Sequence, residues 1–151
     1  MKAENKKQLN ILLADDDEDD QYLFSMAVEK GFEQAKVTTA GDGQALMKIL
    51  KEATKKQPDI IFLDLNMPRK NGKECLEEIR ANKNLAKIPV VIYSTSVSKI
   101  DVDETYKSGA NLYLEKPSDY NHLIKVLPAI LKLDWQKYFP SPDKELYVFT
   151  Y

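Results

Sequence analysis

Four short apolar runs in this chain end in side chains that can hold a metal ion or a phosphoryl group. The side chains at or just after these ends are Asp15, Asp16, Asp64, Ser94 and Lys116. If the four runs are parallel strands of one sheet, their carboxyl ends meet in one crevice, which is where open α/β sheets bind ligands. The sequence therefore predicts one site that contains carboxylates, a hydroxyl and an ammonium group.

The predicted carboxylates would repel one another unless a cation lies between them. Two carboxylates ~4 Å apart repel by about 4 kcal/mol at an effective dielectric constant of 20. Oxygen ligands favour a hard ion such as Mg²⁺, which takes one or two carboxylates and keeps several waters. We expect Asp16 and Asp64 to bind Mg²⁺ directly, with the backbone carbonyl of Asn66 as a further ligand and Asp15 acting through water.

The same side chains have predicted parts in phosphoryl transfer. Asp64 is the expected nucleophile, because carboxylates form acyl phosphates and a metal ion neutralises the incoming charge. Asp15 and Lys116 complete the expected catalytic set, and the lysine would keep Asp64 ionised and later pair with the phosphoryl group. A Ser94 hydroxyl drawn towards that group would leave space for the Tyr113 ring, as in a two-state switch.

The spacing of apolar residues predicts alternating strands and helices. Short apolar runs lie near residues 9–14, 36–40, 59–63, 89–93 and 111–114, and the segments between them carry apolar residues at helical spacing. Repeated strand–helix units of this kind form an α/β fold with a parallel sheet. The first and third runs are almost purely aliphatic, so we place them side by side in the middle of the sheet, with the half-polar second run at an edge.

Length and composition restrict the possible functions. The 151 residues suit one domain, and a formal net charge of −2, from 22 basic and 24 acidic residues, gives no basic stripe for nucleic acid. No stretch of 18 apolar residues is present, so we expect no membrane segment. Cys75 is the single cysteine, which excludes an internal disulfide and a thiolate zinc site and favours a cytoplasmic location.

Four motifs within residues 9–133 resemble the receiver domains of two-component response regulators. The motifs are Ile11–Asp17, Pro58–Pro68 with Gly72, Pro89–Ser94 and Gly109–Pro117. The resemblance implies a flavodoxin-like, doubly wound parallel sheet of five strands in the order 2-1-3-4-5. The segments 82–89 and 94–96 are similar to those of stand-alone receivers associated with phytochromes and hybrid kinases.

The resemblance also carries expectations about the chemistry. It implies that Asp64 accepts a phosphoryl group from the phosphohistidine of a sensor or hybrid histidine kinase, with Mg²⁺ at Asp16 and Asp64. It implies a switch at Ser94 and Tyr113 and a cis peptide bond before Pro117. The protein would then be no enzyme beyond self-catalysed phosphotransfer and slow autodephosphorylation.

We expect the signal to leave through protein contacts, because the chain offers no room for an output domain. The expected docking face, formed by the fourth helix, the fifth strand and the fifth helix, consists of residues 101–109, Tyr113 and residues 119–133. A downstream protein would bind this face, without direct contact to nucleic acid or membrane.

Three positions depart from the common pattern of the family. Ser94 stands where threonine is usual, Thr95 stands where a smaller alanine is usual, and Ser118 replaces a frequent aromatic residue. A serine hydroxyl is less restricted in its rotamer than a threonine hydroxyl. We expect these three differences to affect how long the phosphorylated state lasts, and not whether it forms.

A C-terminal extension, residues 134–151, follows a lead of residues 1–8 and the domain of residues 9–133. It holds six of the fourteen aromatic residues of the chain. Residues 146–151 alternate like a strand, which would pair with a sheet edge within its own domain or across a homodimer. Packing on its own domain is the alternative.

Two other functions remain open from the sequence. A Mg²⁺-dependent phosphohydrolase of the haloacid dehalogenase type also uses an aspartate nucleophile, but it needs a second acid two residues later, where this chain has Asn66. A receiver-like scaffold that never takes phosphate is the other, and the retained set of phosphoacceptor, metal-binding and phosphoryl-binding side chains argues against it.

Overall fold

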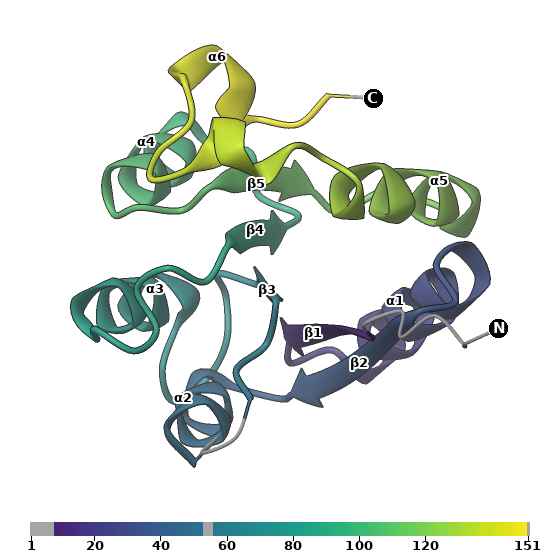
Figure 1. Ribbon diagram of the computed structural model, residues 1–151, viewed down its shortest axis with the longest axis horizontal. Coiled ribbons are helices and arrows are strands. Elements are labelled where there is room, and N and C mark those ends of the chain that lie inside the picture. Colours follow the sequence, from purple (N-terminus) through teal and green to yellow (C-terminus); the bar gives the residue numbers. More distant parts are fainter. Residues whose placement is uncertain (1–7, 53–55, 151) are drawn as a thin grey trace, which may run out of the picture.

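All five predicted strands are present in the structure, a computed structural model that describes residues 8–52 and 56–150. The strands are β1 (Leu9–Ala14), β2 (Ala35–Ala40), β3 (Ile60–Leu63), β4 (Val90–Ser94) and β5 (Leu112–Glu115). They form one parallel sheet in the order β2-β1-β3-β4-β5 (Figure 1). The flavodoxin-like strand order implied by the resemblance is therefore confirmed.

Helices fill the connections between the strands. They are α1 (Glu18–Gly31), α2 (Gly43–Glu52), α3 (Gly72–Ala81), α4 (Lys99–Lys107) and α5 (Tyr120–Leu131), followed by the 3-10 helix η1 (Trp135–Tyr138) and the short α6 (Lys144–Tyr147). Capping side chains set several first turns: Asn71 and Glu74 form a reciprocal capping box at α3, and Asp119 caps α5. In the described ranges, no helix is both long and apolar enough to span a membrane.

The helices cover both faces of the sheet, as right-handed crossovers require. Helices α1 and α5 pack side by side on one face, while α2, α3 and α4 lie on the other (Figure 1). Each face has its own apolar cluster, with Phe24 and Leu127 completely buried in the first and Leu46 and Leu76 in the second. Because both faces are covered, the central strands are almost continuously aliphatic.

The two strands that precede the acids lie side by side. Ala14 at the end of β1 aligns with Leu63 at the end of β3, and the backbone N–H of Asp64 donates to the Ala14 carbonyl (3.0 Å). Strand β2 lies at one edge of the sheet, where most of its residues keep some exposure. The predicted placement of these strands is confirmed.

Gly72 lets α3 begin directly against the backbone that follows β3. A Cβ atom at this position would lie 2.2 Å from the carbonyl oxygen of Asp64 and 2.8 Å from Cα of Leu65. The Gly72 N–H donates to the Leu65 carbonyl (2.9 Å), which closes the loop between the strand and the helix. Only glycine allows this close approach, so the start of α3 and the position of Asp64 are determined together.

The C-terminal extension differs from the predicted strand. Residues 144–147 form a helical turn, so the strand predicted over residues 146–151 is wrong for Leu146 and Tyr147. Val148 pairs with the sheet through an isolated bridge to Tyr113. An alternating apolar pattern over so few residues does not distinguish a strand from a turn. Here the turn is formed, and it buries the Tyr147 ring. The extension packs on its own domain, and Tyr151 lies outside the described residues, as do residues 1–7 of the predicted lead.

The peptide bond before Pro117 also differs from the expectation. In the described part of the chain the cis peptide bond joins Phe139 to Pro140, and the bond between Lys116 and Pro117 is trans. The expected isomer came from the family resemblance, because no local residue pattern specifies the isomer of a bond to proline.

Replacement of Gly72 by alanine tests the close approach of α3 to the backbone that follows β3. We expect Gly72→Ala to lower the free energy of unfolding by about 1–3 kcal/mol, because the added Cβ overpacks against backbone. Gly41→Ala is the control, since a Cβ there meets no atom within 4 Å, and its change should stay within about 0.5 kcal/mol. Urea unfolding measures both, and equal stabilities would contradict the description of this contact.

Candidate functional site

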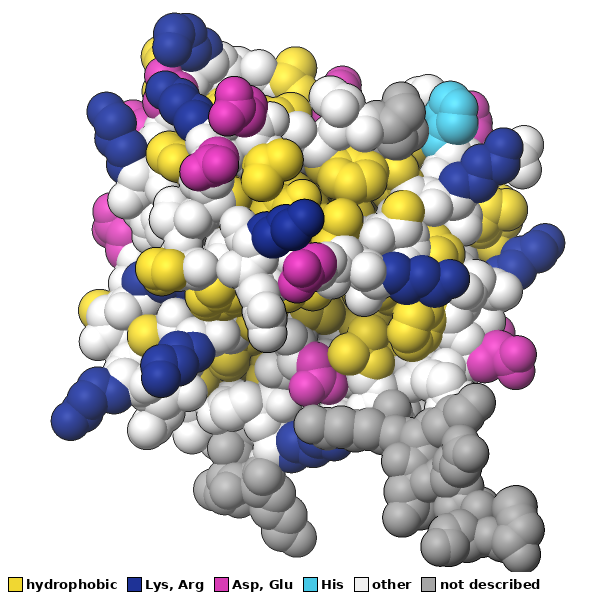
Figure 2. Space-filling view, turned by 45° about the horizontal axis from the view of Figure 1, so that its top comes forward, with side chains coloured by type: hydrophobic (Ala, Val, Ile, Leu, Met, Phe, Trp, Pro, Cys, Tyr) yellow, Lys and Arg dark blue, Asp and Glu magenta, His cyan; other side chains and the backbone are white. Residues whose placement is uncertain are grey.

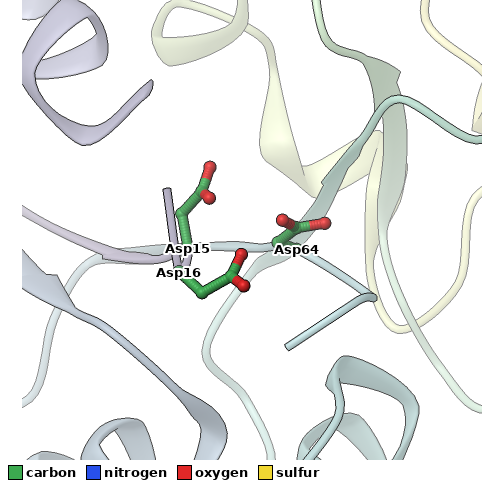
Figure 3. A group of neighbouring side chains, drawn as sticks. All are labelled: Asp15, Asp16 and Asp64. Atoms are coloured by element: carbon green, nitrogen blue, oxygen red, sulfur yellow. The ribbon is translucent and has the colours of Figure 1, made fainter. Parts of the chain in front are cut away.

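Three carboxylates meet at the carboxyl edge of the sheet. Asp15 and Asp16 follow β1 and Asp64 follows β3, and one oxygen from each lies within 4.8 Å of the others. Figure 3 shows the Asp16 carboxylate reaching towards Asp64 from the neighbouring strand end. Asp15 and Asp64 are buried and Asp16 is exposed, so the group is open to solvent on one side.

Burial makes the charged forms of two of these acids unfavourable. Desolvation raises the pKa of Asp15 to about 6, against the lowering effect of its contacts with Lys116 and with the backbone N–H of Asp17. Desolvation likewise raises the pKa of Asp64, opposed mainly by the charge of Lys116. The Lys116 charge therefore does not fully offset the effect of burial on these two acids.

Lys116 is the ammonium group predicted for this site, and it contacts three carboxylates. Its Nζ lies 2.8 Å from Asp15 Oδ2, 2.8 Å from Asp20 Oδ2 and 3.3 Å from Asp64 Oδ2. Burial alone would lower the pKa of Lys116, but the bonds to Asp15 and Asp20 and the charge of Asp64 outweigh it and raise the pKa. The ammonium also lies 5.4 Å from the centre of the Tyr93 ring, a cation–π contact that fixes its position further.

Ser94 and Tyr113, the predicted switch residues, are joined through Ser96. The Ser94 hydroxyl is completely buried and accepts a hydrogen bond from the Ser96 N–H (3.1 Å). The Tyr113 side chain is buried too, and its hydroxyl donates to the Ser96 carbonyl (2.6 Å). The backbone N–H of Lys116 donates to the Ser94 carbonyl (2.9 Å), which brings the serine strand end beside the lysine.

Asp20 and Tyr93 are contacts of the site that sequence reasoning missed. Asp20 belongs to an acidic run that reads equally well as a solvated helix start, and Asp17 at the N-cap does accept hydrogen bonds from the N–H groups of Asp19 and Asp20. Asp20 is the third residue of α1, and a side chain at this position points back over the first turn of the helix. This position is the signal that could have indicated Asp20 as a site residue. Its partner Lys116 is too far along the chain for any spacing pattern to show.

The acidic group fits a divalent cation. The separation of its oxygens is one that a single ion can bridge, and carboxylate oxygens are the ligands that hard divalent ions prefer. The Asp15 Oδ2 atom is buried, and the Lys116 ammonium 2.8 Å away is its charged partner among the described residues. A cation beside it would supply the missing positive charge.

The sequence matches a known family over most of its length. Residues 11–128 match the model of the response regulator receiver domain. This chain belongs to that family. The receiver is 33% identical over 134 residues to Response regulator Rcp1 of Synechocystis sp., and the match covers 86% of this chain and 91% of Rcp1.

Solved structures of other receivers share the fold. The phosphorylated cyanobacterial phytochrome response regulator RcpA has a TM-score of 0.76 and 31% identity, with 87% of this chain and 94% of that chain covered. The Mn²⁺-bound form of Rcp1 has a TM-score of 0.75 and 32% identity, with 89% and 99% covered. Receivers accept phosphoryl groups from histidine kinases, and this receiver carries the acidic cluster that divalent-metal binding requires.

Removal of the exposed acid of the cluster tests metal binding. We expect Asp16→Asn to weaken Mn²⁺ binding by roughly tenfold or more, the size of effect that even partners outside the ligand shell produce. Asp19→Asn removes the same charge from the adjoining helix turn and should change the affinity little. Calorimetric titration measures both, and equal losses would show that net charge rather than ligation controls binding.

Proposed function

We propose that this protein is a stand-alone receiver that takes a phosphoryl group on Asp64 with Mg²⁺ bound and signals by a protein contact. The observation that carries the proposal is the position of the Asp64 carboxylate. Asp64 lies at the edge of the sheet and is 6% exposed, with the carboxylates of Asp15 and Asp16 close by and the Lys116 ammonium 3.3 Å from its Oδ2. A nucleophile, a metal site and a phosphoryl-binding cation thus share one pocket.

The metal ligands in this proposal are Asp16 and Asp64, with Asp15 acting through water and the Asn66 backbone carbonyl as a further ligand. The Asn66 N–H donates to Asp64 Oδ1 (3.4 Å), so the backbone of Asn66 lies close to this acid. Bound Mg²⁺ would supply the positive charge that offsets the approach of an anionic donor.

In the proposed reaction an Asp64 oxygen attacks the phosphorus of a phosphohistidine. The new O–P bond forms as the N–P bond breaks, and the electron pair of that bond stays on the imidazole, which takes a proton from solvent. Lys116 and the Ser94 hydroxyl then pair with oxygens of the transferred group. Attack of water on the phosphorus releases phosphate and regenerates Asp64, which is the slow autodephosphorylation of this proposal.

The phosphoryl donor in this proposal is a sensor or hybrid histidine kinase that docks beside the pocket on α1. That helix exposes a large apolar group, with Tyr22 65%, Leu23 38% and Met26 40% exposed. Leu23 also lines, with Lys116, a cavity of about 120 Å³. Apolar groups beside an active pocket are suited to protein contact.

The proposed output surface consists of α4, β5 and α5, where a downstream protein would bind. Figure 2, turned to bring the side with α4 and α6 forward, shows hydrophobic side chains gathered between charged ones. Val97 and Ile100, beside and within the first turn of α4, are 53% and 67% exposed. The cytoplasmic location and the homodimer stay predictions, as does the division into lead, receiver and extension.

Treatment with a small phosphodonor tests the phosphoacceptor. Incubation with Mg²⁺ and acetyl phosphate should add one PO₃ group to the protein, because an Asp64 oxygen displaces acetate. Intact mass spectrometry should show this single adduct in the wild type and in Asp19→Asn, and no adduct in Asp64→Asn.

The same experiment separates the alternative functions. Sustained release of phosphate over many turnovers would indicate a phosphohydrolase. No adduct in the wild type would indicate a scaffold, and an adduct that persists in Asp64→Asn would place the phosphoacceptor elsewhere.

Asp20 should restrain Lys116 from binding the phosphoryl group. The Asp20 side chain is 36% exposed, and a partly exposed ion pair contributes about 0.5–1 kcal/mol. Asp20→Asn should therefore bind the phosphoryl mimic beryllofluoride about two- to fivefold more tightly, since the ammonium then has one competing anion fewer. Asp19→Asn is the matched control, and an equal gain in that variant would refute a specific role for Asp20.

A further inference from the structure

The C-terminal segment from residue 141 to 150, here called the tail, lies across the proposed output surface. The Tyr106 hydroxyl on α4 donates to the Pro142 carbonyl (2.8 Å), which ties the start of the tail to that helix. Further along, Val148 forms a parallel bridge to Tyr113 at the outer edge of β5. The tail therefore reaches from α4 to the free edge of the sheet, as the position of α6 in Figure 1 shows.

Tyr147 makes the deepest contact of the tail. It is 1% exposed although it lies close to the end of the chain, and its ring packs edge-on against Tyr106 (5.0 Å between centroids) and Tyr113 (6.0 Å). Its hydroxyl lies 2.6 Å from the Thr105 hydroxyl. Thr105 uses its single proton to donate to the Asp101 carbonyl (2.7 Å), so Tyr147 is the donor of this bond.

A short chain of hydrogen bonds joins Tyr147 to the phosphoryl site. Ser96 is bonded through its N–H to Ser94 Oγ and through its carbonyl to the Tyr113 hydroxyl. The Ser96 hydroxyl donates to the Asp101 carboxylate (2.6 Å) in the first turn of α4. Tyr113 packs directly against Tyr147, and Asp101 is connected to Tyr147 through Thr105. Ser96 is hydrogen-bonded to both Tyr113 and Asp101, so both connections to Tyr147 begin at this loop residue.

We propose that the tail is a built-in ligand of the output surface that is held firmly only while Asp64 is unphosphorylated. The inference rests on the function proposed above. Phosphorylation would loosen the tail and open the groove that Tyr147 fills, between Tyr106, Tyr113 and Thr105. The downstream partner is then a protein that places an aromatic or aliphatic side chain in this groove.

The direction of the effect follows from the hydrogen bonds. If Ser94 turns its hydroxyl towards the phosphoryl group, the Ser96 N–H loses its acceptor and the loop is free to move. The bonds from Ser96 to Tyr113 and Asp101 are then lost or rearranged, and these two residues hold Tyr147. Because coupling between two binding events is reciprocal, a tail that prefers the unphosphorylated form must weaken phosphoryl binding by the same factor.

Beryllofluoride titration in the presence of Mg²⁺ measures this coupling in the full chain. Tyr147→Ala should bind the mimic at least about fivefold more tightly than the wild type, the lower end of usual coupling between sites. Tyr147→Phe keeps the ring but loses the bond to Thr105, so it should shift the affinity in the same direction by less. Leu146→Ala truncates a neighbouring tail residue that is 38% exposed and should leave the affinity unchanged.

Hydrogen exchange gives a second measurement on the wild type itself. The Phe149 N–H donates to the Tyr113 carbonyl (2.9 Å), so its exchange should speed up when beryllofluoride is bound. The coupling would be overturned if both Tyr147 variants bound beryllofluoride with unchanged affinity and the exchange rate at Phe149 also stayed unchanged. Weaker binding of beryllofluoride by the variants would overturn the proposed direction of the coupling. If Tyr147→Ala does not fold, Tyr147→Phe decides. A wild type that binds no beryllofluoride would instead overturn the proposed function.

Discussion

The structure depends on an unequal set of charges at the edge of one sheet, where the Lys116 ammonium contacts three carboxylates and a further acid, Asp16, lies beside two of them. Asp15, Asp16 and Asp64 meet because β1 and β3 end at this edge, and Asp20 in the first turn of α1 reaches the Lys116 ammonium. The fold supplies Lys116 as a counter-charge, and burial nevertheless raises the pKa of Asp15. A pocket with surplus negative charge attracts cations, and a bound cation in turn makes the pocket able to receive an anionic group.

Much of this edge could be predicted because it depends on strands. Buried aliphatic runs are easily recognised, and a parallel sheet places all of their carboxyl ends on one side, so the acids after Ala14 and Leu63 had to lie near each other. The third acid next to Lys116 could not be predicted in this way, because Asp20 reaches the lysine from a helix. The path of the tail depends on where the Tyr147 ring finds a partner, which a six-residue pattern does not contain.

The loop after β4 links Ser94 to α4 through hydrogen bonds of Ser96. Ser96 makes hydrogen bonds through its N–H, its carbonyl and its hydroxyl, and each bond leads to a different element. Lys73 on α3 extends this network by pairing with Asp101 (2.7 Å). Such a junction has few alternative arrangements, since moving Ser96 disturbs three partners together, and this favours a two-state response over a gradual one.

The bridge between Val148 and Tyr113 also bears on the solubility of the protein. An outer strand with unpaired backbone groups is a template on which another chain can add, and natural proteins shield or charge such strands. Here Val148 and Phe149 occupy part of the outer side of β5, while β2 at the opposite side presents the exposed Lys36. Both edge strands of the sheet are thus protected against the addition of a strand from another molecule. A chain shortened before Val148 would lose this protection at β5 and would aggregate more readily.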